Sequence, residues 1–95
     1  MVVTLCVLCW ARDGCAAELV AYEDRVLALV PDHGGRVLQR ARTAGERGEP
    51  HEVHLLQFPS EAALDAYLGD ERRAALAADR EAAIDRTQIL RVELQ

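Results

Sequence analysis

The hydrophobic and polar residues of the first third of the chain predict one strand followed by one helix. Residues 2–10 form an unbroken apolar run, which is too short for a buried helix and suits a strand. Residues 16–30 carry apolar side chains at helical spacing, with most charged residues away from that stripe. Pro31 and the pair Gly34-Gly35 then end the helix.

The rest of the chain predicts two strands, a divided helix and a closing strand. Weak alternation predicts a second strand, a polar stretch with two glycines predicts a hairpin connection, and a further apolar run predicts a third strand. Pro59-Ser60 begins the next helix, and Gly69-Asp70 divides it from an alanine-rich helix. The predicted elements are strands at 36–42, 53–58 and 87–94, helices at 60–68 and 71–84, and the connection at 43–50.

The resulting order, β-α-β-β-α-β, predicts an α+β fold of the ferredoxin-like type. This order forms a four-stranded antiparallel sheet with two right-handed crossovers and all helices on one face. The first and third strands then lie at the centre, and they are the most apolar ones. We expect residues 1–95 to form a single domain, since this length supports one core.

The first strand is apolar on both of its faces, which a sheet covered on one side does not require. Val3, Leu5 and Val7 alternate with Cys6 and Leu8. A second copy of the same sheet is the economical cover for the other face, so the pattern predicts a homodimer with the sheets packed together.

Charge and composition exclude several functions. Sixteen carboxylates and eleven arginines, with no lysine, give a net charge of −5, which disfavours nucleic-acid binding. An RNA-binding module of this strand order would also need exposed aromatic residues on its third and first strands, and the third offers only His54 and Phe58 among aliphatic neighbours. No segment is long and apolar enough to predict a membrane helix.

The cysteines indicate a reducing compartment. The apolar start of the chain has no preceding basic residue and no small-residue cleavage site, so we expect no signal peptide and a cytoplasmic location. Cys6 and Cys9 have redox-motif spacing, but residues three apart on a strand point to opposite faces, so we expect neither a disulfide nor a shared metal. Cys15, at a helix start, is the more reactive candidate.

Several motifs resemble those of the dimeric α/β-barrel superfamily. They are Gly34-Gly35-Arg36, Phe58-Pro59-Ser60, the turn Asp70–Arg73, and Arg80 on the helix that follows. The likeness is to a branch of short uncharacterised proteins, related to antibiotic-biosynthesis monooxygenases and polyketide cyclases, and it covers nearly the whole chain. These motifs are structural, because the glycines permit unusual backbone angles and Pro-Ser begins a helix.

The resemblance implies a small-molecule pocket between the sheet and the helices. It points to a cofactor-independent enzyme of secondary metabolism, a monooxygenase, cyclase or isomerase, acting on an aromatic or polyketide-like substrate. The alternative is a non-catalytic ligand-binding or structural dimer, since fold alone does not determine activity. The chain has no asparagine, so the asparagine and tryptophan arrangement of the monooxygenases cannot be matched.

The histidines are the first candidates for chemistry. His54 shares a strand face with Leu56 and Phe58, where an imidazole in an apolar setting could act as acid or base, or could be a hydrogen-bonded histidine of the dimer face. His33 precedes the glycine pair and is either a turn residue or a group at the pocket mouth. The histidine spacing predicts no metal site.

An arginine and three aromatic residues complete the candidate site. Arg80 falls near the inward side of its helix, where it would pair with a carboxylate or bind an anionic substrate oxygen. The remaining arginines of the last helices suggest a solvated face. Trp10, Tyr22 and Tyr67 are candidates for packing a substrate, with core or interface packing as the alternative role.

Overall fold

The computed structural model describes residues 1–95. Its strands and helices follow one another in the predicted order, and two short 3₁₀ turns, η1 and η2, lie before β2 and before β3. The elements are β1 (Val3–Ala11), α1 (Ala16–Leu27), η1 (Val30–His33), β2 (Arg36–Arg42), η2 (Glu46–Gly48), β3 (Glu52–Phe58), α2 (Glu61–Leu68), α3 (Glu71–Ala74), α4 (Ala77–Ala83) and β4 (Ile84–Arg91).

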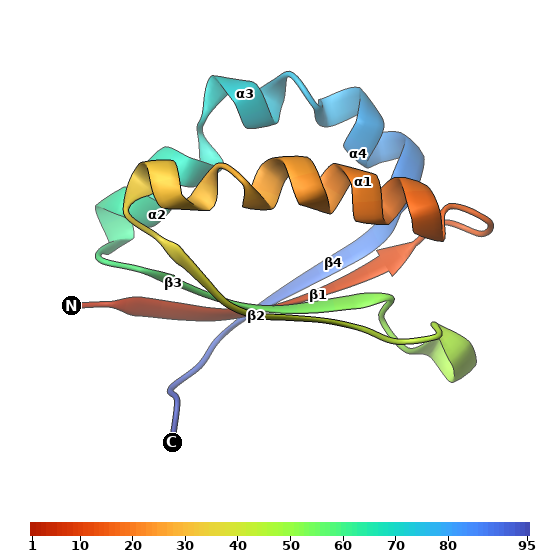
Figure 1. Ribbon diagram of the computed structural model, residues 1–95, viewed down its shortest axis with the longest axis horizontal. Helices are drawn as coiled ribbons and strands as arrows, with labels where there is room; N and C mark the ends of the chain where they lie inside the picture. The colour runs from red at the N-terminus through yellow and green to blue at the C-terminus, as the bar shows by residue number, and fades with distance from the viewer.

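The four strands form one antiparallel sheet in the order β2-β3-β1-β4. The two most apolar strands, β1 and β3, are therefore central, as predicted. Figure 1 shows the helices on one face of this sheet. On the opposite side lie only the connection that contains η2, at one end of the sheet, and the C-terminal segment, which runs away from it. The ferredoxin-like α+β fold is confirmed.

Strand alternation divides β1 between the two faces. Val3, Leu5, Val7 and Cys9 are buried beneath the helices. On the open face Thr4 is buried as well, whereas Cys6, Leu8 and Trp10 are only partly buried. Cys6 and Cys9 thus lie on opposite faces, as predicted from their spacing.

Local signals set most of the helix ends. Ser60 caps α2 by accepting a hydrogen bond from the backbone N–H of Ala63 at 3.1 Å. Asp70 caps α3 in the same way, through the N–H of Arg72 at 2.8 Å.

The glycine pair has two different structural roles. Gly34 ends η1 in the left-handed region, with φ 72°, where a residue with a β-carbon is strained. At Gly35 a β-carbon would lie 2.8 Å from both Phe58 and Val30, so the close approach of η1 to β3 requires glycine.

Three predicted boundaries are wrong. The first helix ends at Leu27 and not at residue 30, because Pro31 has no N–H to donate to the Leu27 carbonyl, and the chain tightens into η1. The predicted helix 71–84 is two helices, α3 and α4, with the junction at residues 75–76, and no residue pattern signals this break.

The last strand begins three residues earlier than predicted. Ile84 leaves α4 directly into β4, where it is buried and pairs with Ala11. Its apolar side chain suits either a helix end or a strand start, so pattern alone could not place the boundary. Beyond Arg91 the Val92 N–H still donates to the Thr4 carbonyl at 3.0 Å.

Candidate functional site

A cavity of about 100 Å³ lies between the sheet and the helices. Its floor comes from β1, β3 and β4, and its walls come from the four helices, with ten of its fifteen lining residues apolar. An apolar cavity with a few converging polar groups is typical of a small-molecule site. The polar lining residues are Glu23, His54, Arg73, Arg80 and Thr87.

One wall of the cavity is backed by a buried ionic network on β3. Glu52 has no exposed surface, and its carboxylate accepts hydrogen bonds from Arg40 at 2.8 and 2.9 Å and from Arg42 at 3.0 Å. Arg40 also donates to Asp24 at 2.6 Å, which ties β2 to α1. A buried carboxylate is tolerated when it is paired and hydrogen-bonded in this way.

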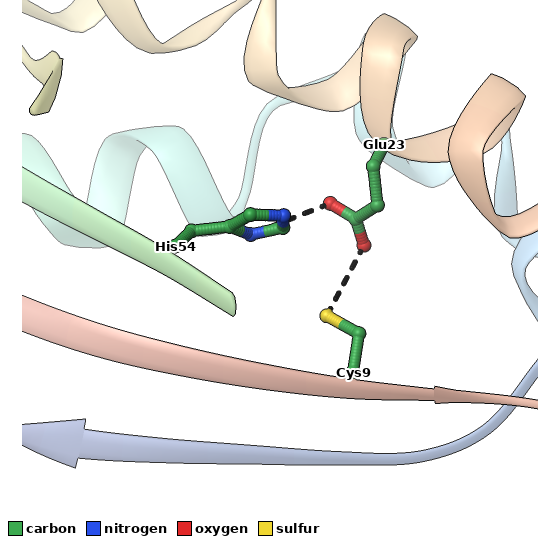
Figure 2. A group of neighbouring side chains, drawn as sticks. All are labelled: Cys9, Glu23 and His54. Atoms are coloured by element: carbon green, nitrogen blue, oxygen red, sulfur yellow. Dashed lines mark hydrogen bonds and ion pairs between the residues drawn. The ribbon is translucent and has the colours of Figure 1, made fainter. Parts of the chain in front are cut away.

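His54 connects this network to the cavity. Its Nε2 lies 2.7 Å from a Glu52 carboxylate oxygen, so the hydrogen-bond network assigns the ring proton to Nε2. The other ring nitrogen, Nδ1, lies 3.9 Å from the second buried carboxyl group, that of Glu23 on α1. Figure 2 shows the Glu23 carboxyl group between the His54 ring and the Cys9 sulfur, which donates to it at 3.6 Å.

The environment shifts the two carboxyl groups in opposite directions. Burial raises the pKa of Glu23, and the nearby His54 offsets this effect only in part. Burial acts in the same direction on Glu52, but hydrogen bonds from Arg40, His54 and Arg42 outweigh it and lower the pKa of Glu52. Two carboxyl groups on either side of one imidazole thus have different protonation tendencies, a pattern that favours proton transfer.

The Cys9, Glu23 and His54 donor atoms lie within 4.8 Å of one another, close enough for a metal ion. The surroundings oppose a cation, however. Burial, and then the neighbouring Glu23, raise the pKa of the Cys9 thiol, whereas a metal needs the thiolate. Two arginines, Arg73 and Arg80, line the same cavity.

Four of the six predicted site residues line this cavity: Tyr22, His54, Tyr67 and Arg80. His54 does share its buried face with Leu56 and Phe58. The expectation of a mostly apolar setting for it is wrong, because it lies between two carboxyl groups. The Tyr67 hydroxyl donates to the Val26 carbonyl at 2.9 Å, and burial raises the pKa of Tyr67 to about 12.

The other two predicted site residues lie elsewhere. The His33 ring pairs with the Asp70 carboxylate at 2.7 Å, edge-on to Tyr67 and outside the cavity lining. Trp10 points to the open face of the sheet, where its ring N–H donates to the Gly48 carbonyl and the Arg86 guanidinium stacks on it at 4.3 Å. Strand alternation explains why Trp10 points away from the cavity, since its neighbour Cys9 points to the helix side of the sheet.

Two expectations about arginines need correction. Arg80 is exposed at the cavity edge, and its hydrogen bond goes to the Thr87 hydroxyl at 3.2 Å, with no carboxylate within ion-pair distance. Arg73, which sequence analysis placed on a solvated face, is half-buried and lines the cavity.

Sequence analysis missed Glu23, Glu52 and Arg40. A signal existed for Glu52, because it lies two residues before His54 and so shares its strand face. Glu23 is four residues after Leu19 and three before Val26, both buried, so it falls on the apolar stripe of α1 although it carries a charge. Arg40 could be placed only by the pairing of β2 with β3.

None of the helices is long and apolar enough to cross a bilayer. The fold defines a class, the ferredoxin-like α+β proteins, and the cavity of this chain lies between its sheet and its helices. Residues 14–93 match the family described as "Domain of unknown function (DUF1330)", and the chain belongs to that family. No curated protein matches the chain significantly.

Solved structures share the fold at low sequence identity. A protein of unknown function from Rhodopseudomonas palustris is 17% identical, with a TM-score of 0.79, over 99% of this chain and 82% of that one. A candidate antibiotic biosynthesis monooxygenase from Caulobacter crescentus is 20% identical, with a TM-score of 0.79, over 99% and 90%. A dimeric protein of unknown function from Bacteroides fragilis is 12% identical, with a TM-score of 0.75, over 98% and 96%.

Proposed function

We propose that this protein is a cofactor-independent enzyme that moves a proton on a small organic substrate, as an isomerase or a cyclase does. The observation that carries the proposal is the Glu23–His54–Glu52 arrangement at the cavity wall. Glu23 is a buried carboxyl group with a raised pKa beside the Nδ1 of an imidazole whose Nε2 is held by Glu52. We infer a general acid and base oriented by a third group, in which the 3.9 Å between the Glu23 carboxyl group and Nδ1 shortens when a ligand binds.

The two faces of His54 have separate roles in this proposal. Glu52, itself held by Arg40 and Arg42, fixes the ring and stabilises it when it carries a second proton. Glu23 and Nδ1 then share the mobile proton and exchange it with a carbon or oxygen atom of a ligand in the cavity. Cys9 donates to Glu23 and helps to position it.

The size of the cavity limits the substrate. About 100 Å³ is less than the roughly 150 Å³ of a cavity that admits benzene. Of the aromatic and polyketide-like substrates considered above, a short 3-oxo compound, the smallest polyketide-like unit, suits this volume best. Tyr22 and Tyr67 pack against the ligand, and Arg80 supplies positive charge at the edge of the cavity.

Proton exchange in deuterated water tests the proposal. A panel of short carbonyl compounds, among them 3-oxobutanoate and butanone, is followed by NMR for loss of the proton signal next to the carbonyl. We expect exchange above the buffer rate, and Glu23→Gln to slow it by about 10²-fold or more. Glu18→Gln, on the exposed side of the same helix, is the matched control and should leave the rate unchanged.

Other outcomes would overturn the proposal. Ligand binding without exchange would favour the non-catalytic alternative, and so would exchange that Glu23→Gln leaves unchanged. A cavity that accepts none of the panel would favour a purely structural dimer.

We also propose that the chain forms a homodimer through the open face of its sheet. The support is an apolar stripe on that face, together with the dimeric state of the similar protein from Bacteroides fragilis. Leu90 remains 42% exposed beside Cys6, and Leu55 completes the row on β3. Burial of such a stripe against its own copy is a common solution for small domains.

Light scattering at micromolar concentration tests the dimer. We expect twice the chain mass for the native protein and the mass of one chain for Leu55→Asp. Ala78→Asp, on the exposed surface of α4, should remain dimeric. A native protein that is monomeric, or a Leu55→Asp variant that stays dimeric, would contradict this interface.

We infer a cytoplasmic location from the cysteines. Cys6, Cys9 and Cys15 are all free, and the first two lie on opposite faces of one strand. Free thiols are typical of a reducing compartment. Fractionation of cells that express the chain with a C-terminal tag tests this, and recovery outside the cytoplasm would contradict it.

A further inference from the structure

The roof of the cavity carries two guanidinium groups that have no carboxylate partner. We propose that Arg73 and Arg80 bind the carboxylate of the substrate, so that the ligands of this site are small carboxylic acids. The inference deepens the proposed function and rests on it for the reaction, but the binding that it predicts can be measured separately.

Arg73 supplies the first part of the subsite. Its Nε is buried and has no hydrogen-bond partner, which is costly for a charged donor. Another of its nitrogens donates to the Leu68 carbonyl at 3.2 Å, and the guanidinium lies 4.8 Å from the centre of the Tyr67 ring. Stacking on Tyr67 holds the group in place beside the cavity that both residues line.

Arg80 supplies the second part. It reaches from α4 to the sheet, where it donates to the Thr87 hydroxyl on β4 at 3.2 Å. This neutral partner leaves the positive charge uncompensated. Arg80 is exposed, as are Leu68 and Ile89 nearby in the lining, so this part of the cavity is where a ligand can enter from solvent.

The other arginines that face the helices are paired. Arg72, next to Arg73, binds both Asp70 and Asp32 at 2.8 Å. Arg40 and Arg42 share Glu52. Among the arginines of the α-helices, Arg25 also has a carboxylate partner, Asp79, so Arg73 and Arg80 are the two without one, on a protein whose net charge is −5.

An anion is the ligand that satisfies this arrangement. A guanidinium binds a carboxylate through parallel, charge-assisted hydrogen bonds, and an apolar wall strengthens them by excluding water. Arg73 and Arg80 share one small cavity with Glu23 and His54, so an acid bound by its carboxylate would place its neighbouring carbons toward the proton-holding groups.

Isosteric ligands separate charge from shape. Butanoate and butanamide have the same number of heavy atoms, and we would titrate each into ¹⁵N-labelled protein and follow backbone shifts by NMR. We expect butanoate to bind at least tenfold more tightly than butanamide. Arg80→Gln and Arg73→Gln should each weaken butanoate binding by about tenfold or more and leave butanamide unchanged.

Matched controls keep the test decisive. Arg72→Gln removes a neighbouring charge of the same helix whose partners lie outside the cavity, and it should have little effect. If Arg73→Gln does not fold because the Tyr67 stack is lost, the exposed Arg80 still tests the subsite. Equal binding of the acid and the amide, or an Arg72→Gln effect as large as that of Arg80→Gln, would overturn the inference.

The two proposals can fail independently. Selective butanoate binding without proton exchange on 3-oxobutanoate would support the carboxylate subsite and contradict the proposed enzyme activity. Exchange on butanone that depends on Glu23, together with butanoate binding that does not depend on Arg73 or Arg80, would support the enzyme activity and contradict the subsite.

Discussion

The two faces of the sheet invert the usual relation between polarity and burial. On β3, the charged or ionisable Glu52 and His54 are completely buried beneath the helices, whereas the aliphatic Val53 and Leu55 are only partly covered on the open face. On β1 the helix-side residues Val3, Leu5, Val7 and Cys9 are all buried, whereas Cys6 and Leu8 on the open face are apolar but only partly buried.

The inversion separates two uses of one sheet. The covered face contains ionisable groups because the arginines of β2 and the carboxyl groups of α1 satisfy them there. The open face has aliphatic side chains that the chain itself covers only in part. Chemistry in the proposed site and association with a second copy thus come from alternate residues of the same strands.

The largest expected difference between the faces is in thiol reactivity. Cys6 is partly exposed on the open face, whereas Cys9 is completely buried and its pKa is raised by burial and by Glu23. In the monomeric Leu55→Asp variant, whose open face is not covered by a second copy, we expect Cys6 to react with a maleimide at least about 10³-fold faster, because Cys9 reacts only after unfolding. Mass spectrometry of digested samples measures both rates. Similar rates would contradict the assignment of faces.

Breaking the ionic network is expected to have the next largest effect. Arg40→Met leaves Glu52 buried with fewer donors, and we expect the free energy of unfolding to fall by about 3 kcal/mol. Urea denaturation measures it. Arg36→Met, an exposed residue of the same strand with no ion pair, should change stability by about 0.5 kcal/mol or less. If Arg40→Met lowers stability no more than Arg36→Met does, the network does not stabilise the covered face.

A smaller loss is expected from crowding the covered face. In Gly35→Ala the added methyl group would meet Phe58 and Val30, and overpacking of this kind costs about 2 kcal/mol. Thermal unfolding measures the change. At Gly69, where a β-carbon would meet only a backbone oxygen at 3.4 Å, the same substitution should be better tolerated. The opposite ranking would contradict the tight packing of η1 on β3.

The smallest effect concerns pH. The folded state raises the pKa of Glu23, so it binds this proton more tightly than the unfolded chain does. Stability associated with Glu23 is therefore complete below its ordinary pKa and is lost as the pH rises through the raised value. Glu23→Gln should remove this decline while leaving stability at low pH nearly unchanged. Urea titrations across pH test it, and an unaltered profile would place the titration elsewhere.

Much of the fold was predictable because it depends on local chemistry. Ser60 and Asp70 indicate helix starts because their side chains can cap a helix, and both accept the expected backbone hydrogen bonds. The junction of α4 and β4 was not predictable, since Ile84 is equally suited to both elements. The break between α3 and α4 has no sequence signal.

The candidate site was predictable only in part, for a physical reason. His54 and Tyr22 could be placed on inward faces by periodicity, but the groups that give His54 its chemistry come from α1 and from a neighbouring residue on its own strand. Sequence rules assign charged residues to solvent. Glu52 breaks that rule because Arg40, from another strand, pairs with it, and Glu23 breaks it because it is buried beside Cys9 and His54.

By itself, the sequence determined the order of the elements, the central place of β1 and β3, and the surplus of apolar surface on β1. These features depend on side-chain periodicity and on residues near one another in the chain. Only the tertiary structure decided which ionisable groups are buried together and which arginines remain unpaired. Burial and ion pairing depend on contacts between residues distant in the chain, and such contacts exist only after β2, β3, α1 and α4 have packed.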